Sequence, residues 1–111
     1  MDDIIKETLE LKQIILSSNE YKEYKKSERV LNSNKEINDL IERIKKLQKE
    51  IINKEDKKEE TDKEEIEVQS LYKKLNSYKE YRNYIDASKK FNESLTYIQK
   101  EFEDYFNQFI I

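Results

Sequence analysis

Two stretches of the chain carry apolar residues at steps of three and four, the spacing that places side chains on one face of an α-helix. The first stretch contains Ile37, Leu40, Ile44, Leu47 and Ile51. The second is interrupted only by a small serine, and its large members are Tyr81, Tyr84, Phe91, Leu95, Ile98, Phe102, Tyr105 and Phe109. Both stretches are therefore predicted to be amphipathic helices. We call the second stripe the C-terminal seam.

The C-terminal seam is long enough to need a cover. At 1.5 Å per residue it runs roughly 42 Å, and a stripe about 10 Å wide exposes about 400 Å², near the limit that a soluble monomer tolerates. The preceding helix, near 34–54, is shorter than the seam, so it covers the seam only in part unless the N-terminal helices cover the rest. The sequence predicts that a second copy supplies the cover. The residues of both stripes are therefore expected to form either the core of the protein or the homodimer interface.

Helix boundaries must be marked without glycine or proline, because the chain has neither. A Ser or Thr followed three residues later by Glu forms a capping box, in which each side chain bonds the other's free backbone N–H. Four boxes occur where the apolar pattern pauses: Ser17 with Glu20, Ser33 with Glu36, Thr61 with Glu64, and Ser77 with Glu80. With the apolar pattern they predict helices near 3–16, 18–31, 34–54, 62–75 and 78–109. The first two form either separate helices or one kinked rod.

One phrase of the sequence occurs twice. Residues 19–32 read NEYKEYKKSERVLN and residues 79–92 read KEYRNYIDASKKFN. Aligning 11–32 with 71–92 matches Leu11 with Leu71, Ser17 with Ser77, Glu20 with Glu80, Tyr21 with Tyr81, Tyr24 with Tyr84 and Asn32 with Asn92. Each copy is typical of a new helix whose first turns present two tyrosines on one face. Either pseudo-symmetric halves or shared helical composition accounts for the match.

The segment 53–65 contains no apolar residue, so we expect a solvated loop or the exposed tip of a helical hairpin, about 53–63. Its acid pairs, such as Glu64 with Glu65, are interpreted as a solvated face. At 111 residues the chain has the length of one domain. The predicted fold is all-α: one domain over 1–111, with about five helices in an elongated antiparallel bundle and a long C-terminal helix.

Composition favours helix and argues for folding. Charged residues make up 42% of the chain and hydrophobic residues 35%, but 22 Lys and Arg nearly balance 25 Asp and Glu, for a net charge of -3. A low net charge with eight Tyr and four Phe is typical of a folded chain rather than a disordered one.

The absence of Cys and His removes most catalytic and metal chemistry. Disulfides, thiol nucleophiles and thiolate metal sites all require cysteine. The remaining carboxylates, lysines and tyrosines occur at the density of a helix surface. We therefore expect no enzyme, no metal, no cofactor and no small-molecule ligand. The first residues lack the features of a signal peptide, and no apolar run is long enough to span a membrane, so a cytoplasmic protein is expected.

Direct binding to nucleic acid is weakly supported. Lys22, Lys25, Lys26 and Arg29 form the most basic segment beside Tyr21 and Tyr24, but glutamates alternate with them and the chain is net acidic. A solvated helix face is the better interpretation. The last residues contain acids and no Lys or Arg after Lys100, which disfavours an anionic membrane surface. Phe106, Ile110 and Ile111 lie beside the seam rather than on it.

The order of these segments resembles the YlbF/YmcA, or control-of-competence, family of Gram-positive regulators. The resemblance covers about residues 4 to 106. It rests on LKQIILSSNEYKEYKKSERVLNSNKEINDLIERIKKLQKEI, the charged gap, and EEIEVQSLYKKLNSYKEYRNYIDASKKFNESLTYIQKEF. It implies a small all-helical protein that self-associates and has no active site of its own.

The resemblance also implies a regulatory adaptor. Its best-known members join family paralogues in a complex that engages ribonuclease Y, and so steer transcript maturation, competence, biofilm formation and sporulation. Some members carry iron–sulfur clusters through cysteines, a role that a chain without Cys does not share. The alternative function is a structural or chaperone-like helical module without regulatory specificity.

Overall fold

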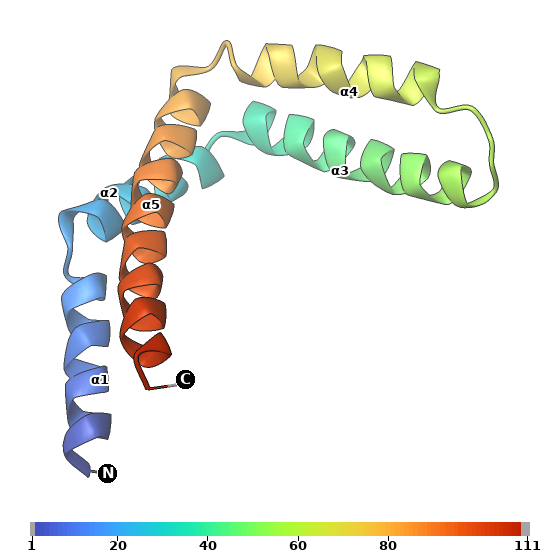
Figure 1. Cartoon of the computed structure of the whole chain (residues 1–111). Helices are drawn as coiled ribbons and strands as arrows, with labels where there is room; N and C mark the ends of the chain where they lie inside the picture. Colours follow the sequence, from blue (N-terminus) through green and yellow to red (C-terminus); the bar gives the residue numbers. More distant parts are fainter. Residues whose placement is uncertain (1, 110–111) are drawn as a thin grey trace. The chain divides into compact units, whose positions relative to one another are not determined.

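The computed structural model describes residues 2–109, which form five α-helices joined by short connections (Figure 1). The helices are α1 (Asp2–Leu16), α2 (Asn19–Asn32), α3 (Lys35–Asp56), α4 (Asp62–Leu75) and α5 (Lys79–Asn107). No strand occurs in this part of the chain. The prediction of an all-α fold with a long C-terminal helix is confirmed, and each helix boundary lies within two residues of its prediction. A turn at residues 17 and 18 separates α1 from α2, so the two do not form one rod.

The described residues divide into two compact units. The first unit holds residues 2–27 and 84–109, and the second holds residues 28–83. α2 and α5 each begin in one unit and end in the other, whereas α3 and α4 lie entirely in the second.

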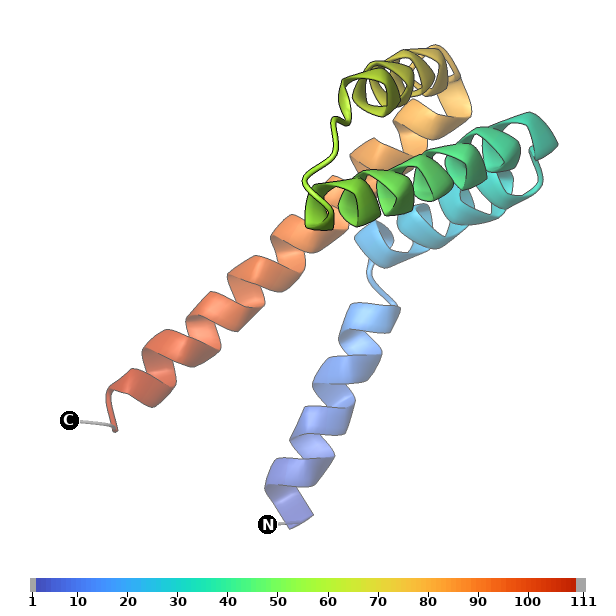
Figure 2. The same cartoon turned by 90° about the vertical axis from the view of Figure 1, so that its right-hand side faces the viewer.

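The second unit is built on a hairpin of α3 and α4, which lie side by side along their length (Figure 2). Its buried apolar residues are Leu31, Ile37, Ile44, Leu47 and Leu75. Leu40 and Ile51 are half-buried on the same face of α3. Burying each large aliphatic side chain stabilises the fold by about 1.5–3 kcal/mol. The predicted stripe from 37 to 51 is therefore hairpin core, covered within the chain.

Polar bonds along the hairpin link residues distant in sequence. The Tyr78 hydroxyl donates to Glu36 Oε2 over 2.7 Å, joining the start of α5 to the start of α3. This bond to a carboxylate raises the pKa of the Tyr78 phenol above its usual value. Further along, Arg43 Nη2 lies 3.0 Å from Glu67 Oε1, and Gln48 Nε2 donates to Tyr72 Oη over 3.3 Å. These bonds are exposed, so packing rather than polar pairing contributes most of the hairpin's stability.

The tip of the hairpin differs from its prediction. α3 continues to Asp56, and α4 begins at Asp62 after a short connection. Glu64 was interpreted as part of a solvated face, but it is only 9% exposed and accepts a hydrogen bond from Lys54 Nζ. The pattern of apolar residues does not predict that a glutamate is buried. Glu64 can occupy its partly buried position because its carboxylate is paired with the cation of Lys54.

The first unit is held together by aromatic rings. Tyr21 of α2 lies 5.4 Å from Phe91 of α5, centroid to centroid. Tyr24 lies 5.5 Å from Phe91 and 5.7 Å from Tyr84. Such separations are those of favourable ring pairs. Tyr24 and Tyr84 are the equivalent positions of the repeated phrase, so the two copies pack against each other at this point.

Serine side chains close three of the helices. Without glycine, the last turn of each helix needs another way to satisfy its free carbonyls. The hydroxyls of Ser18, Ser33 and Ser77 donate to carbonyls three residues back, at Ile15, Val30 and Lys74, over 2.6, 2.7 and 2.6 Å. These serines therefore end the preceding helix.

Three of the four predicted N-caps are wrong by one residue. α2 is capped by Ser18, whose Oγ accepts from the Tyr21 backbone N–H over 3.2 Å, and not by Ser17. α3 is capped by Asn34, whose Oδ1 accepts from the Ile37 N–H over 3.1 Å, and not by Ser33. α5 begins at Lys79, so Ser77 lies too early to cap it.

Thr61 is at the predicted N-cap of α4, although its side chain makes no capping bond. Before α2 and α3, the predicted serine is followed directly by another residue that can cap a helix, Ser18 or Asn34. The capping-box pattern alone does not decide which of two such neighbours is the N-cap.

The C-terminal end of α3 carries backbone strain. Lys58 has φ 58°, the left-handed region that side chains with a Cβ disfavour. The Glu59 N–H donates to the Lys54 carbonyl over 2.8 Å and the Lys58 N–H to the Glu55 carbonyl over 3.0 Å. This bond pair is the Schellman motif, which usually has glycine at the left-handed position.

Replacing Lys58 with glycine should therefore stabilise the protein. We expect Lys58→Gly to raise the free energy of unfolding by about 0.5–1 kcal/mol, because glycine adopts positive φ without steric cost while adding some freedom to the unfolded chain. Urea unfolding followed by far-UV circular dichroism measures the change. Lys57→Gly is the matched control, since Lys57 has an ordinary φ of -92°. Equal effects of the two substitutions would contradict the strain at Lys58.

The pair of Lys54 and Glu64 predicts a dependence of stability on pH. The hydrogen bond from Lys54 holds the pKa of the Glu64 carboxyl below its usual value. Ionised Glu64 thus stabilises the fold above the unfolded pKa of about 4.3, and this contribution is lost as the pH falls through the lower folded value. We expect Glu64→Gln to lower the urea midpoint at neutral pH, and its difference from the wild type to shrink as the pH falls below the unfolded pKa of about 4.3. Glu65→Gln, at an exposed position, should follow the wild type throughout.

Candidate protein-binding surface

The C-terminal seam divides into a covered and an exposed part. Tyr81 and Tyr84 are half-buried at the start of α5, and Phe91, Leu95 and Ile98 are half-buried further along. Beyond them Phe102 is 45% exposed, Tyr105 56% and Phe109 70%. The boundary between the two parts is set by α2, the helix that packs against α5. Because α2 begins at Asn19 and its Tyr21 contacts Phe91, α2 covers α5 only as far as about the middle of α5.

The exposed part of α5 and the turn that follows it carry a cluster of rings, which we call the aromatic end: Phe102, Tyr105, Phe106 and Phe109. Phe102 and Phe106 stack at 6.2 Å, and Tyr105 meets Phe106 and Phe109 edge-on at 6.0 and 5.2 Å. These rings contact one another and stay exposed to solvent. Ile110 and Ile111 lie outside the described residues.

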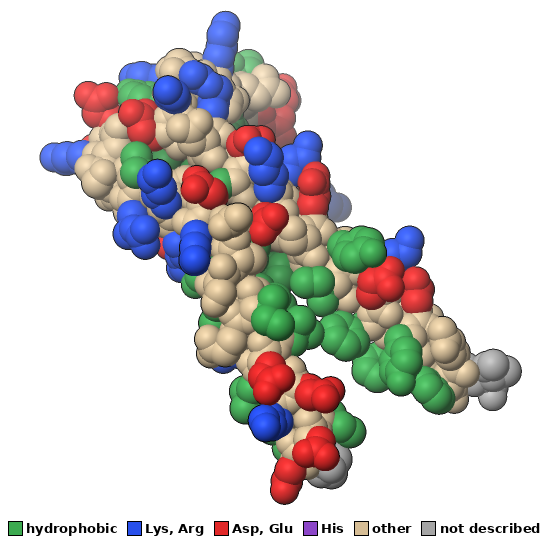
Figure 3. All heavy atoms as spheres, turned by 90° about the vertical axis from the view of Figure 1, so that its left-hand side faces the viewer, with side chains coloured by type: hydrophobic (Ala, Val, Ile, Leu, Met, Phe, Trp, Pro, Cys, Tyr) green, Lys and Arg blue, Asp and Glu red, His purple; other side chains and the backbone are tan. Residues whose placement is uncertain are grey.

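α1 carries a second exposed apolar face. Ile4 is 66% exposed, and Ile5, Leu9 and Ile14 are also exposed. Sequence reasoning did not single out this face, although its apolar residues recur with helical spacing. Figure 3 shows apolar side chains gathered both on the C-terminal part of α5 and along α1, two helices of the same unit.

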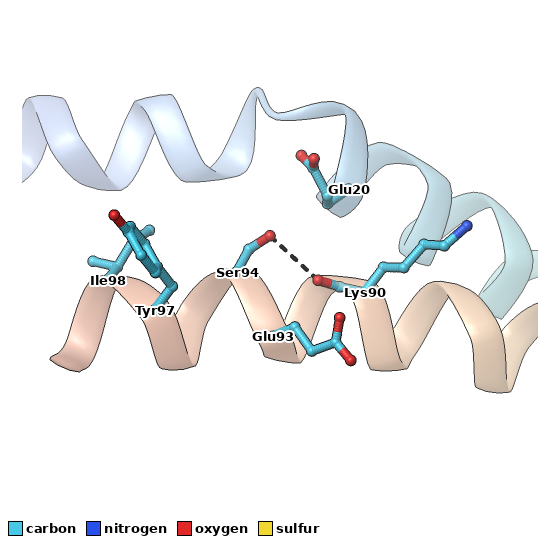
Figure 4. A pocket seen from close by; sticks show the side chains of 6 residues that line it. All are labelled: Glu20, Lys90, Glu93, Ser94, Tyr97 and Ile98. Atoms are coloured by element: carbon cyan, nitrogen blue, oxygen red, sulfur yellow. Dashed lines mark hydrogen bonds between the residues drawn. The ribbon is translucent and has the colours of Figure 1, made fainter. Parts of the chain in front are cut away.

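An open depression lies between the start of α2 and the middle of α5. Glu20 comes from α2, and the other lining residues are all on α5: Lys90, Glu93, Ser94, Tyr97 and Ile98 (Figure 4). Ser94 Oγ already donates to the Lys90 carbonyl over 3.2 Å, within its own helix. The lining mixes both signs of charge with Tyr97 and Ile98, a composition suited to contact with another protein.

The basic segment of α2 is partly used by packing. Lys22, Lys26 and Arg29 are exposed, whereas Lys25 is half-buried with Nζ 5.9 Å from the centre of the Tyr21 ring. A cation at this distance over an aromatic face is attracted by the ring. Lys25 and Tyr21 therefore contribute to the packing of α2.

Residues 2–109 contain neither a metal-binding cluster nor a helix that could span a membrane. No group of three or more Asp or Glu side chains there could hold a metal ion. None of the described helices combines the length and apolar character that crossing a bilayer requires.

The fold and these surfaces define a small all-helical protein in which two amphipathic helices are only partly covered. The chain belongs to the YlbF/YmcA family, because the family model described as "Control of competence regulator ComK, YlbF/YmcA" matches residues 4–105. The resemblance seen in the sequence is confirmed over nearly the range predicted. The family's name links its members to control of the competence regulator ComK. No curated protein matches the chain.

The division of the seam can be tested with two of its phenylalanines. We expect Phe91→Ala to lower the free energy of unfolding by about 1–3 kcal/mol, because a half-buried ring loses its contacts with Tyr21 and Tyr24. Phe109→Ala should change it by less than about 0.5 kcal/mol, because the ring is mostly exposed. Urea unfolding measures both. Equal losses would mean that the aromatic end is already buried in a stable assembly.

Proposed function

We propose that the protein is a non-catalytic regulatory adaptor that binds other proteins through the exposed apolar faces of α1 and the aromatic end of α5. The observation that carries the proposal is the exposure of Phe102, Tyr105, Phe106 and Phe109 at the end of a helix whose first half is packed. Exposed aromatic clusters of this kind are typical of protein–protein contacts rather than of solvated helix faces.

Membership of the YlbF/YmcA family supports a regulatory role and gives its setting. The family's name supports a place in control of competence. In our proposal the adaptor acts in the cytoplasm with family paralogues and ribonuclease Y, in RNA processing that also affects biofilm formation and sporulation. The chain has no Cys, so the iron–sulfur role that some relatives have does not form part of the proposal.

The homodimer remains a prediction, with a smaller interface than the whole seam. Phe91 and Tyr84 already pack against α2, which leaves Phe102, Tyr105 and Phe109 exposed to another chain, either a second copy or a different protein. A structural or chaperone-like module would use the same exposed rings to hold many proteins without specificity. The two functions differ in how many partners the rings select.

Affinity capture from the native cell distinguishes them. We expect the wild-type chain to retain one defined set of proteins, including ribonuclease-linked ones, and the double variant Phe102→Ser, Phe106→Ser to lose that set. Both residues are exposed, so the variant should keep the wild-type circular dichroism and urea midpoint.

Ile66→Ser is the matched control, because Ile66 is an exposed apolar residue of α4 in the second unit. It should retain the partners. Capture of many unrelated unfolded proteins would instead support the chaperone-like module. Loss of partners with Ile66→Ser alone would move the binding surface to the hairpin.

A further inference from the structure

The negative charge of the chain is concentrated around its exposed apolar faces. α1 carries four acids, Asp2, Asp3, Glu7 and Glu10, against two lysines, and residues 98–109 carry three acids, Glu101, Glu103 and Asp104, against one lysine. These two segments thus have a formal charge of -4, while the whole chain has -3 and the remaining residues together +1.

The acids border the aromatic rings in sequence and are themselves exposed. Glu101 comes directly before Phe102, and Glu103 and Asp104 lie between Phe102 and Tyr105, all within the last two turns of α5. We call the aromatic end with these three acids and the apolar residues of α1 the acidic-rimmed face. Part of it is visible in Figure 3, where acidic side chains adjoin the apolar ones on both helices.

Charge decides between the possible occupants of this face. A second copy would bring its own acids against those of the first, and like charges brought together oppose association. An anionic membrane surface is disfavoured for the same reason. A helix with one apolar side and flanking Lys or Arg side chains suits this face. Its apolar side covers the exposed rings, and its cations neutralise the acids that border them.

We propose that the acidic-rimmed face binds a basic amphipathic helix of a partner protein. This inference rests on the proposed adaptor function and specifies the chemistry of the partner. The apolar side of the partner helix lies against Phe102, Phe106 and the apolar residues of α1, and its cations reach Glu101 and Glu103, which at about 100° per residue flank Phe102 on its two sides.

The dimensions and the rings of the face suit such a partner. The exposed segment of α5, residues 99–107, is about 13 Å long, which corresponds to about two and a half helical turns in the partner. The ring faces that remain open to solvent also attract Lys and Arg side chains by cation–π interaction. A partner helix of this kind therefore gains both from burying its apolar side and from its cations.

A designed peptide tests the inference on the full chain. The probe is a labelled peptide of about 18 residues that contains only leucine and lysine, with the leucines at helical spacing. One control peptide has glutamate in place of each lysine, and another has the same leucines and lysines in an order that forms no helical face. Fluorescence anisotropy should show saturable binding of the probe, at least about tenfold tighter than either control, and weakening as salt rises.

The matching variant reverses the rim: Glu101→Lys, Glu103→Lys and Asp104→Lys. Lysines near a helix C-terminus suit the helix dipole, so α5 should remain folded, which circular dichroism checks. This variant should bind the Leu/Lys probe at least about tenfold more weakly and gain affinity for the Leu/Glu peptide. The control variant, Glu59→Lys with Glu60→Lys and Glu65→Lys, makes the same charge change at exposed positions of the second unit and should bind like the wild type.

Equal affinity of the wild type for the Leu/Lys and Leu/Glu peptides would overturn the inference, as would unchanged binding after rim reversal. A wild-type dimer in sedimentation that the probe does not open would assign the face to a second copy and overturn it too. The adaptor function is judged separately by cellular capture. Defined partners that the rim-reversed chain still captures would leave the adaptor intact and refute only the basic helix.

Discussion

The difference in length between α2 and α5 determines what the first unit can bury. α2 has 14 residues and α5 has 29, which correspond to about 21 and 43 Å of helix. The two meet through Tyr21, Tyr24, Tyr84 and Phe91. Since α2 is half as long as α5, it cannot cover the whole apolar stripe of its partner. The exposed aromatic end is a direct consequence of this mismatch.

A chain without glycine must also end its helices by other means. Ser18, Ser33 and Ser77 satisfy carbonyls of the preceding turn with their hydroxyls, which a serine can do without leaving the usual backbone regions. At the hairpin tip the reversal requires a left-handed residue, and Lys58 takes that conformation. The tip is supported by the Schellman bonds and by the pair of Lys54 and Glu64. Strain in the backbone and a partly buried ion pair thus occur in the same short segment.

The sequence predicts helix faces well and helix partners poorly, for a physical reason. Spacing identifies Ile37, Ile44 and Leu47 as one face, because the helical period is fixed by backbone geometry. It contains no information on which helix covers that face, so α4 as the cover of α3, and α2 as the cover of half of α5, appear only in the structure. The N-caps show the same limit at a finer scale, since Ser17 and Ser18 are both good caps and only the backbone decides between them.

The folding of a single chain does not explain why the residues of the aromatic end are aromatic. An exposed ring contributes little to the free energy of folding, and a cluster of them lowers solubility. Phe102, Tyr105 and Phe109 could therefore be polar without loss of packing in the first unit, whereas Phe91 could not. Acids placed between such rings keep the free protein in solution through their charge, and they also exclude partners of the same sign. In the function we propose, the same few residues of α5 supply both the charge that keeps free chains apart and the rings that bind a partner, and the function depends on that combination rather than on any reactive group.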